Sequence, residues 1–149
     1  MKKKILISTG GSGGHVIPAL NFYEHLKHNN EVFLTSDLRG LRFIDTKIYN
    51  NKVIDVPDIK NNIFKIPINL LLFLISIIKS FFYLKQKKID KIISTGGYMT
   101  FPICIASIFT KSKLFLFEPN MVLGQSNLFF LKQCRKVFCF YFCLCFSRR

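Results

Sequence analysis

The sequence of 149 residues contains no tryptophan and few acidic side chains. It has 8 aspartates and glutamates against 22 lysines and arginines, which gives a formal net charge of +14 at pH 7. This imbalance disfavours basic partners and favours anionic ones, namely nucleic acid, lipid headgroups or phosphorylated substrates. No recognisable nucleic-acid-binding module accompanies the charge, so we expect no nucleic-acid partner.

The cysteines provide no framework for a metal-binding or disulfide-rich fold. There are five of them, an odd number, and four lie near the C-terminus, at Cys134, Cys139, Cys143 and Cys145. Their spacing matches no zinc pattern and no compact disulfide arrangement, so we interpret them as reduced thiols. No Asp-x-Asp pair occurs either. We therefore expect no metal site and no cofactor.

A signal peptide is also missing from the pattern. Lysines at positions 2–4 could begin one, but the apolar residues 5–7 lead at once into a glycine-rich loop. An h-region of sufficient length does not follow, so we expect the protein to stay in the cytoplasm.

One long uncharged run stands out, and it is too short for a simple membrane span. Residues 66–78 carry no charge, Asn69 and Ser76 interrupt the run, and Lys79 ends it. A spanning helix needs about 20 apolar residues. The segment 64–84 is open to three interpretations: a core helix, a helix at a membrane surface, or a transmembrane helix. A surface helix would place lysines against lipid headgroups, and the lysines available are Lys79, Lys85, Lys87 and Lys88.

The stretch from Ser8 to Leu20 is the most informative part of the chain. Residues 10–14 contain four glycines and follow a short apolar run. Glycines leave backbone N–H groups accessible and permit positive φ angles, and a strand that turns into a helix there forms an anion site. The spacing matches neither Gly-x-Gly-x-x-Gly nor a Walker loop. An ordinary glycine-rich turn between strand and helix remains the alternative.

The remaining pattern alternates strands with helices, which predicts an α/β fold with a parallel sheet and helices on both faces. Ligands of such sheets bind at the carboxyl ends of the strands, so the polar motifs that follow strands should converge in one crevice. The expected strands are 4–8, 31–35, 52–56, 89–94 and 114–117. The expected helices are 17–28, 64–85, 100–109 and 124–131.

Three blocks together resemble the MurG family, the bacterial lipid-linked N-acetylglucosaminyltransferases of glycosyltransferase family 28. The first block is 10–20, Gly-Gly-Ser-Gly-Gly-His-Val-x-Pro-Ala-Leu, and the second is 94–102, Ser-Thr-Gly-Gly-Tyr-x-x-x-Pro. The third is 117–120, Phe-Glu-Pro-Asn, where the family usually has His-Glu-Gln-Asn, and it is followed by Gly124 and Asn127. The blocks stand in the order and spacing of the family.

The resemblance implies the N-terminal, acceptor-side half of a two-domain GT-B glycosyltransferase with a Rossmann-like sheet. It places this half at residues 1–138 with a last strand near Val137, leaves 139–149 as a divergent or truncated tail, and implies that the C-terminal donor domain is absent. The implied reaction transfers N-acetylglucosamine (GlcNAc) from UDP-GlcNAc to lipid I, undecaprenyl-pyrophosphoryl-MurNAc-pentapeptide. It inverts the anomeric centre and forms the β-1,4 bond of lipid II.

The family works as a peripheral enzyme on the cytoplasmic face of the bacterial inner membrane. The resemblance therefore favours the membrane-surface interpretation of 64–84. An alternative function is a non-catalytic, membrane-docked half that binds the acceptor and needs a separate donor-binding chain.

His15 is the implied catalytic residue. It stands at the start of the first helix, where the helix dipole disfavours the imidazolium ion, and a neutral imidazole can accept a proton from an attacking hydroxyl. A simple helix-capping role is the alternative. The implied donor or diphosphate contacts are Ser12, Gly13, Gly14 and Asn120. Further acceptor or crevice contacts are Gly10, Gly11, Gly96, Gly97, Tyr98, Glu118 and Asn127.

Overall fold

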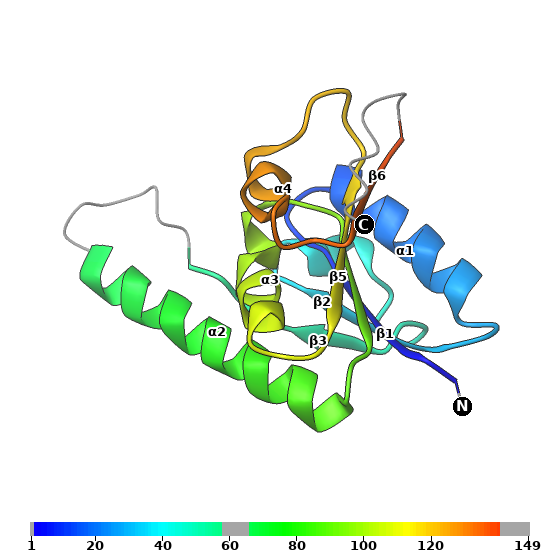
Figure 1. The fold of residues 1–149 in the computed structure, drawn as a ribbon, viewed down its shortest axis with the longest axis horizontal. Coiled ribbons are helices and arrows are strands. Elements are labelled where there is room, and N and C mark those ends of the chain that lie inside the picture. The colour runs from blue at the N-terminus through cyan, green and yellow to red at the C-terminus, as the bar shows by residue number, and fades with distance from the viewer. Residues whose placement is uncertain (1, 58–65, 141–149) are drawn as a thin grey trace.

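Six parallel strands form the centre of the molecule (Figure 1), and the computed structural model describes residues 2–57 and 66–140. The strands are β1 (Lys4–Ser8), β2 (Glu31–Ser36), β3 (Asn51–Val53), β4 (Lys91–Ser94), β5 (Lys113–Glu118) and β6 (Lys136–Cys139). Their order in the sheet is β3-β2-β1-β4-β5-β6, and each neighbouring pair is parallel. Because the order reverses between β1 and β4, this pair marks the switch point where such folds bind ligands.

Helices cover both faces of the sheet (Figure 1), as the sequence predicted. On β1, Leu6 packs into the core beneath α2 (Ile66–Lys87), α3 (Phe101–Ile108) and α4 (Gln125–Phe130). Its neighbour Ile7 packs on the opposite face, against α1 (Gly13–Leu26). Successive strand residues point to opposite faces, which is why continuous apolar runs, rather than alternating ones, form these strands.

Several element boundaries differ from the prediction. The first helix begins at Gly13 rather than at residue 17. Glycine has a low helix propensity, but Ser12 is in an extended conformation at the N-cap and the glycines occupy the first turn, where the backbone still becomes helical. The third strand covers Asn51–Val53 rather than 52–56, because it is the edge strand and pairs only with β2. The expected first two residues of the long helix, 64 and 65, lie outside the described residues.

The last strand of the sheet lies near Val137, as the resemblance implies. In β6, Phe138 pairs with Phe117 of β5 and Cys139 pairs with Glu118. Cys139 therefore belongs to the sheet, while residues 141–149 of the expected tail lie outside the described part of the chain.

Candidate functional site

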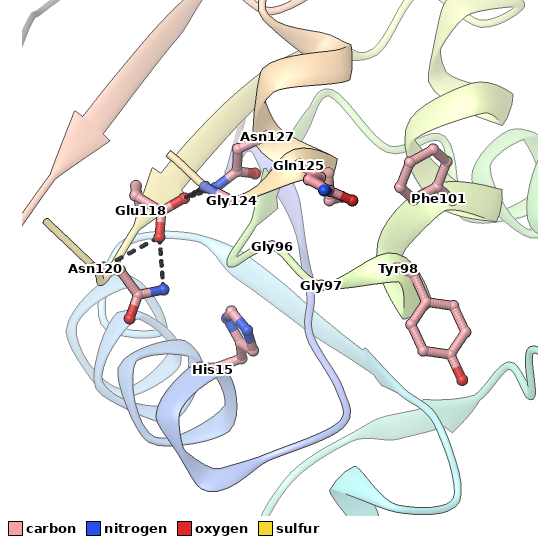
Figure 2. A pocket seen from close by; sticks show the side chains of 11 residues that line it. His15, Gly96, Gly97, Tyr98, Phe101, Glu118, Asn120, Gly124, Gln125 and Asn127 are labelled. Carbon is pink, nitrogen blue, oxygen red and sulfur yellow. Dashed lines mark hydrogen bonds between the residues drawn. The ribbon is translucent and has the colours of Figure 1, made fainter. Parts of the chain in front are cut away.

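A pocket of about 590 Å³ lies at the carboxyl ends of β1, β4 and β5 (Figure 2). It brings together residues from the three sequence blocks. The first and last lining residues, His15 and Asn127, are more than one hundred positions apart in the chain. Its lining residues are His15, Gly96, Gly97, Tyr98, Phe101, Glu118, Asn120, Gly124, Gln125, Ser126 and Asn127.

His15 points into this pocket from the first turn of α1 (Figure 2). Its Nδ1 lies 2.7 Å from the backbone oxygen of Thr95, at the end of β4. A carbonyl oxygen can only accept, so Nδ1 carries the hydrogen of this bond. In the neutral imidazole, Nε2 is then a hydrogen-bond acceptor. The hydrogen bond therefore fixes both the orientation of the ring and its acceptor atom.

The Gly96–Gly97 turn allows His15 and Asn127 to approach each other. Gly96 has φ +89°, and a Cβ atom built there would lie 3.2 Å from Asn127 Nδ2 and 3.5 Å from His15 Cε1. A side chain at this position would be strained by its backbone conformation and would crowd both polar groups. The glycine pair in the second block thus has a steric function in the wall of the pocket.

Glu118 is 2% exposed and organises the loop that closes the pocket. Its Oε1 accepts hydrogen bonds from the backbone N–H and the Nδ2 of Asn120, at 3.1 and 2.9 Å. Its Oε2 accepts from the backbone N–H of Gly124 and from Asn127 Nδ2, at 2.8 and 2.9 Å. Four donors from the protein surround the carboxylate, so it holds Asn120 and Asn127 in place (Figure 2).

The side-chain oxygen of Asn127 is buried and has no partner among the described residues. The side chain is 1% exposed, and Nδ2 donates both to the backbone oxygen of Phe117 and to Glu118. Both partners are acceptors, which assigns the amide nitrogen to that side and leaves Oδ1 on the other. Oδ1 of Asn127 and Oγ of Ser126 are buried without a hydrogen bond inside the described part of the chain. Buried polar atoms of this kind cost stability unless a ligand satisfies them.

The glycine-rich loop lies beside the pocket and does not line it. Gly11 has φ +78°, and its N–H donates to the carboxylate of Asp37 at 2.8 Å, so this N–H is unavailable to a ligand. Gly13 and Gly14 have N–H groups that precede the first backbone hydrogen bonds of α1, in which His15 and Val16 donate to the oxygen of Ser12. The N–H of Gly11 is therefore engaged within the protein, whereas those of Gly13 and Gly14 lie at the start of α1.

The long helix α2 exposes its apolar side chains and buries serines. Ser76 and Ser80 face the protein, and Ser76 Oγ donates to the backbone oxygen of Asp55 at 2.9 Å. The helix is long and apolar enough to cross a membrane, yet only 11% of its most apolar window is buried. A core helix would show the opposite distribution. Its exposed apolar residues are Ile66, Ile68, Leu70, Leu71, Leu72, Leu74, Ile75, Ile78 and Phe82.

The lysines expected at a membrane surface lie on or directly after α2. Lys79 and Lys85 are exposed on the helix, and Lys87 is half-buried with its Nζ 5.4 Å from the centre of the Phe33 ring. Lys88 follows the end of the helix and is exposed.

Sequence reasoning missed the lining residues Phe101, Gln125 and Ser126, and also Asp37 and Arg39 next to the pocket. Ser126 carries a buried hydroxyl without a partner among the described residues. The exposed Arg39 forms an ion pair with the buried Asp37 and also donates to the hydroxyl of Tyr98. Asp37 lies two residues after the predicted strand 31–35, which was the available signal that it lies at the same edge of the sheet. Within the described residues, no group of three or more His, Cys, Asp and Glu side chains could hold a metal ion.

A parallel sheet with this strand order and a pocket at its switch point defines a Rossmann-like ligand-binding domain. Residues 5–139 match the glycosyltransferase family 28 N-terminal domain. The chain therefore belongs to glycosyltransferase family 28, and the family expected from the three blocks is confirmed.

Two curated relatives support this membership. The chain is 51% identical over 140 residues to the UDP-N-acetylglucosamine--N-acetylmuramyl-(pentapeptide) pyrophosphoryl-undecaprenol N-acetylglucosamine transferase of Pelagibacter ubique, which covers 94% of this chain and 39% of the relative. It is 33% identical over 143 residues to the protein of the same name from Leptospira interrogans, covering 91% of this chain and 39% of the relative. The chain thus spans about two fifths of the length of these relatives.

Solved structures confirm the fold. The crystal structure of Acinetobacter baumannii MurG matches with a TM-score of 0.82 and 22% sequence identity, over 99% of this chain and 47% of that one. A UDP-N-acetylglucosamine 2-epimerase matches with a TM-score of 0.56 and 14% identity, over 86% of this chain and 36% of that one. The chain has the fold of the N-terminal half of a GT-B protein.

Proposed function

We propose that this domain binds the lipid-linked acceptor in a transferase that converts lipid I to lipid II with UDP-GlcNAc as donor. The family membership and the names of the relatives support this assignment. Because the chain spans about two fifths of those relatives, we assign most donor contacts to a second domain. That domain is either part of the same polypeptide or a separate donor-binding chain.

The hydrogen-bonding character of the pocket is the observation that carries the proposal. His15 Nε2, in the neutral ring, and Asn127 Oδ1 are acceptors, and Ser126 Oγ can both donate and accept. A sugar supplies hydroxyl and amide donors that match these atoms. Among the described residues, those that line the pocket include no lysine or arginine, so the sugar of the acceptor fits it better than a diphosphate does.

In the proposed reaction, the 4-hydroxyl of the MurNAc residue attacks the anomeric carbon of UDP-GlcNAc from the face opposite to UDP. His15 Nε2 removes the hydroxyl proton as the β-1,4 bond forms, and the bond to UDP breaks with its electron pair on the departing phosphate oxygen. The hydrogen bond from Nδ1 to Thr95 keeps the ring in the tautomer that can accept this proton. No metal or other cofactor is part of the proposal.

Residues near the pocket rim fit the charged parts of the two substrates. Ser12, Gly13 and Gly14 offer N–H groups at the positive end of the α1 dipole for a diphosphate. Asn120 is exposed, and Glu118 binds one of its amide hydrogens, which leaves its other polar atoms for the donor sugar.

The exposed face of α2 fits the surface of an anionic membrane. Its apolar side chains would enter the boundary between headgroups and acyl chains, and its lysines would contact phosphates. The exposed face of α2 thus supports a peripheral location on the cytoplasmic face of the inner membrane, where a polyprenyl-linked acceptor is accessible.

An activity assay with the 149 residues alone tests whether lipid II formation requires a second, donor-binding domain. We expect little lipid II from radiolabelled UDP-GlcNAc and lipid I, because closure of two lobes around the donor excludes water and positions the reactants. Addition of a separately expressed donor-binding domain of the family should increase the yield. Robust lipid II formation by the 149 residues alone would contradict the proposed dependence on a second domain.

A further inference from the structure

A cluster of four side chains, two from the second sequence block and two from outside the blocks, joins the glycine-rich loop to the wall of the pocket. It lies where the segments after β1, β2 and β4 meet, and it consists of Asp37, Arg39, Tyr98 and Met99. Tyr98 lines the pocket, whereas the buried Asp37 and the exposed Arg39 are not among the lining residues.

Asp37 is the centre of this cluster. Its side chain is 1% exposed, and its Oδ1 accepts hydrogen bonds from the backbone N–H groups of Gly11 and Gly40, both at 2.8 Å. Its Oδ2 accepts from Arg39 Nε at 3.2 Å. A buried carboxylate with three donors, one of them cationic, fixes the positions of the segments that supply them.

The backbone at Gly10 packs tightly against the side chains of Asp37 and Met99. A Cβ atom on Gly10 would lie 2.6 Å from Asp37 Oδ1 and 3.0 Å from Met99 Cβ. The loop after β1, the loop after β2 and the turn after β4 are therefore in direct contact, and the position of Arg39 depends on all three.

Arg39 extends from this centre to Tyr98. Its Nη2 donates to the hydroxyl of Tyr98 and to Sδ of Met99, the latter at 3.3 Å, and its Cζ lies 5.3 Å from the centre of the Tyr98 ring. The rigid guanidinium binds the carboxylate with one nitrogen and the phenol with another. A lysine has a single charged nitrogen on a flexible stem and cannot reproduce both contacts.

We propose that Asp37 and Arg39 are positioning residues that hold the Tyr98 ring as a wall of the pocket and thereby set its affinity for the acceptor. This inference rests on the proposed function of the pocket. Neither residue touches the substrate. They act by removing the freedom of the Tyr98 side chain before the acceptor binds, so that binding does not have to order it.

The test is a double-mutant cycle on acceptor binding with Arg39→Lys and Tyr98→Phe. The probe is a soluble lipid I analogue with a short polyprenyl chain, and isothermal titration calorimetry gives its Kd. Each single substitution should weaken binding by about tenfold, and the double variant should bind no worse than the weaker single variant, because both changes break the same contact.

The matched control is Arg42→Lys, which makes the same exchange at an exposed position three residues further on and should not change Kd. Additive losses, or a normal Kd for Arg39→Lys, would overturn the proposal.

A second measurement does not depend on the acceptor. In protein labelled with ¹³C-tyrosine, the ring signals of Tyr98 should shift and broaden in Arg39→Lys and Asp37→Asn and stay unchanged in Arg42→Lys, while circular dichroism shows the same fold. An unchanged Tyr98 signal would overturn the positioning role even if the acceptor binds. Failure of the wild-type chain to bind the analogue, with Tyr98 signals that respond as predicted, would instead overturn the proposed function.

Discussion

A single hydrogen bond decides what His15 can do in the pocket. The backbone oxygen of Thr95 holds the proton on Nδ1, so Nε2 of the neutral ring is the atom that can receive a proton from an acceptor. A helix-capping histidine would direct its ring nitrogens at the α1 backbone instead. The geometry therefore favours the chemical role over the capping role for this residue.

We predict that His15→Ala lowers kcat of the assembled two-domain enzyme much more than it raises KM for UDP-GlcNAc. Loss of a general base typically costs 10²–10⁴-fold. Steady-state kinetics with lipid I and UDP-GlcNAc give both constants. His25→Ala, at an exposed position on the same helix, is the control and should leave kcat unchanged. A folded His15→Ala enzyme with normal kcat would mean that the residue serves only the structure.

Glu118→Gln should destabilise the fold and loosen the pocket. The glutamine NH₂ group would face N–H donors that now bind a carboxylate oxygen, so at least one donor would lose its partner, at a cost of about 1–3 kcal/mol. Urea denaturation measures this change in the free energy of unfolding. Glu24→Gln, which removes one end of an exposed salt bridge with Lys27, should cost well under this amount. Equal costs for the two variants would contradict the role assigned to Glu118.

Burial raises the pKa of Cys104 to about 12, although hydrogen bonds with Ser94 and Thr100 act in the opposite direction. The thiol of the unfolded chain ionises near its ordinary pKa, so the native state keeps a proton that the unfolded state loses. Stability should therefore fall as the pH rises above about 9. Urea midpoints between about pH 8 and 11 should decline less steeply in Cys104→Ala than in the wild type. Parallel declines would show that Cys104 does not contribute.

Motif spacing anticipated some of these residues and not others. His15, Gly96, Glu118 and Asn127 belong to blocks with recognisable neighbours, and the structure brings them together. Asp37 and Arg39 depend on contacts between segments about 26 and 60 positions apart, and no local pattern predicts such contacts. The sequence also could not predict that Oδ1 of Asn127 lacks a partner, because the hydrogen-bond partners of Nδ2 become known only in the folded chain.

At the scale of elements, hydrophobic patterning predicted where α2 lies but not which way it faces. The uncharged run gave a helix of nearly the right length. The buried face, however, is formed by Ser76, Ser80 and Leu84, because small side chains allow the helix to pack closely on its neighbours. The sequence contained nearly equal apolar character around the helix, so only the packed structure distinguishes the inner from the outer face.

We predict that α2 binds vesicles containing anionic lipid without spanning them. Each lysine near the surface contributes on the order of 1 kcal/mol, and salt should weaken binding. Leu71→Ser and Leu74→Ser, on the exposed face, should reduce vesicle flotation with little change in thermal stability. Ser80→Leu, at a fully buried position, should lower the free energy of unfolding by about 1–3 kcal/mol through overpacking.

Two results would contradict this assignment of faces. Flotation that persists unchanged in high salt and alkaline carbonate would indicate an integral span. Normal flotation by both leucine variants would show that another surface contacts the lipid.

For the whole molecule, the carboxyl ends of the predicted strands correctly indicated where the pocket lies. The sequence predicted that motifs following β1, β4 and β5 would converge, and the switch point of the sheet is where the pocket lies. The glycine-rich loop stands beside this pocket, and the N–H of its Gly11 is bound to Asp37. Glycine content indicates a tight turn after a strand, but the loops of neighbouring strands determine which N–H groups remain for a ligand.

Equilibrium binding measurements with the 149 residues test whether this domain binds the lipid-linked acceptor. Calorimetric titration should show saturable binding of one short-chain lipid I analogue per molecule, weakened by about tenfold or more in Asn127→Ala, which removes the unpaired acceptor Oδ1. UDP-GlcNAc titrated in parallel should bind much more weakly, because its main contacts are assigned to the other domain. Absence of acceptor binding by the folded chain, or tighter binding of UDP-GlcNAc than of the acceptor, would contradict the account.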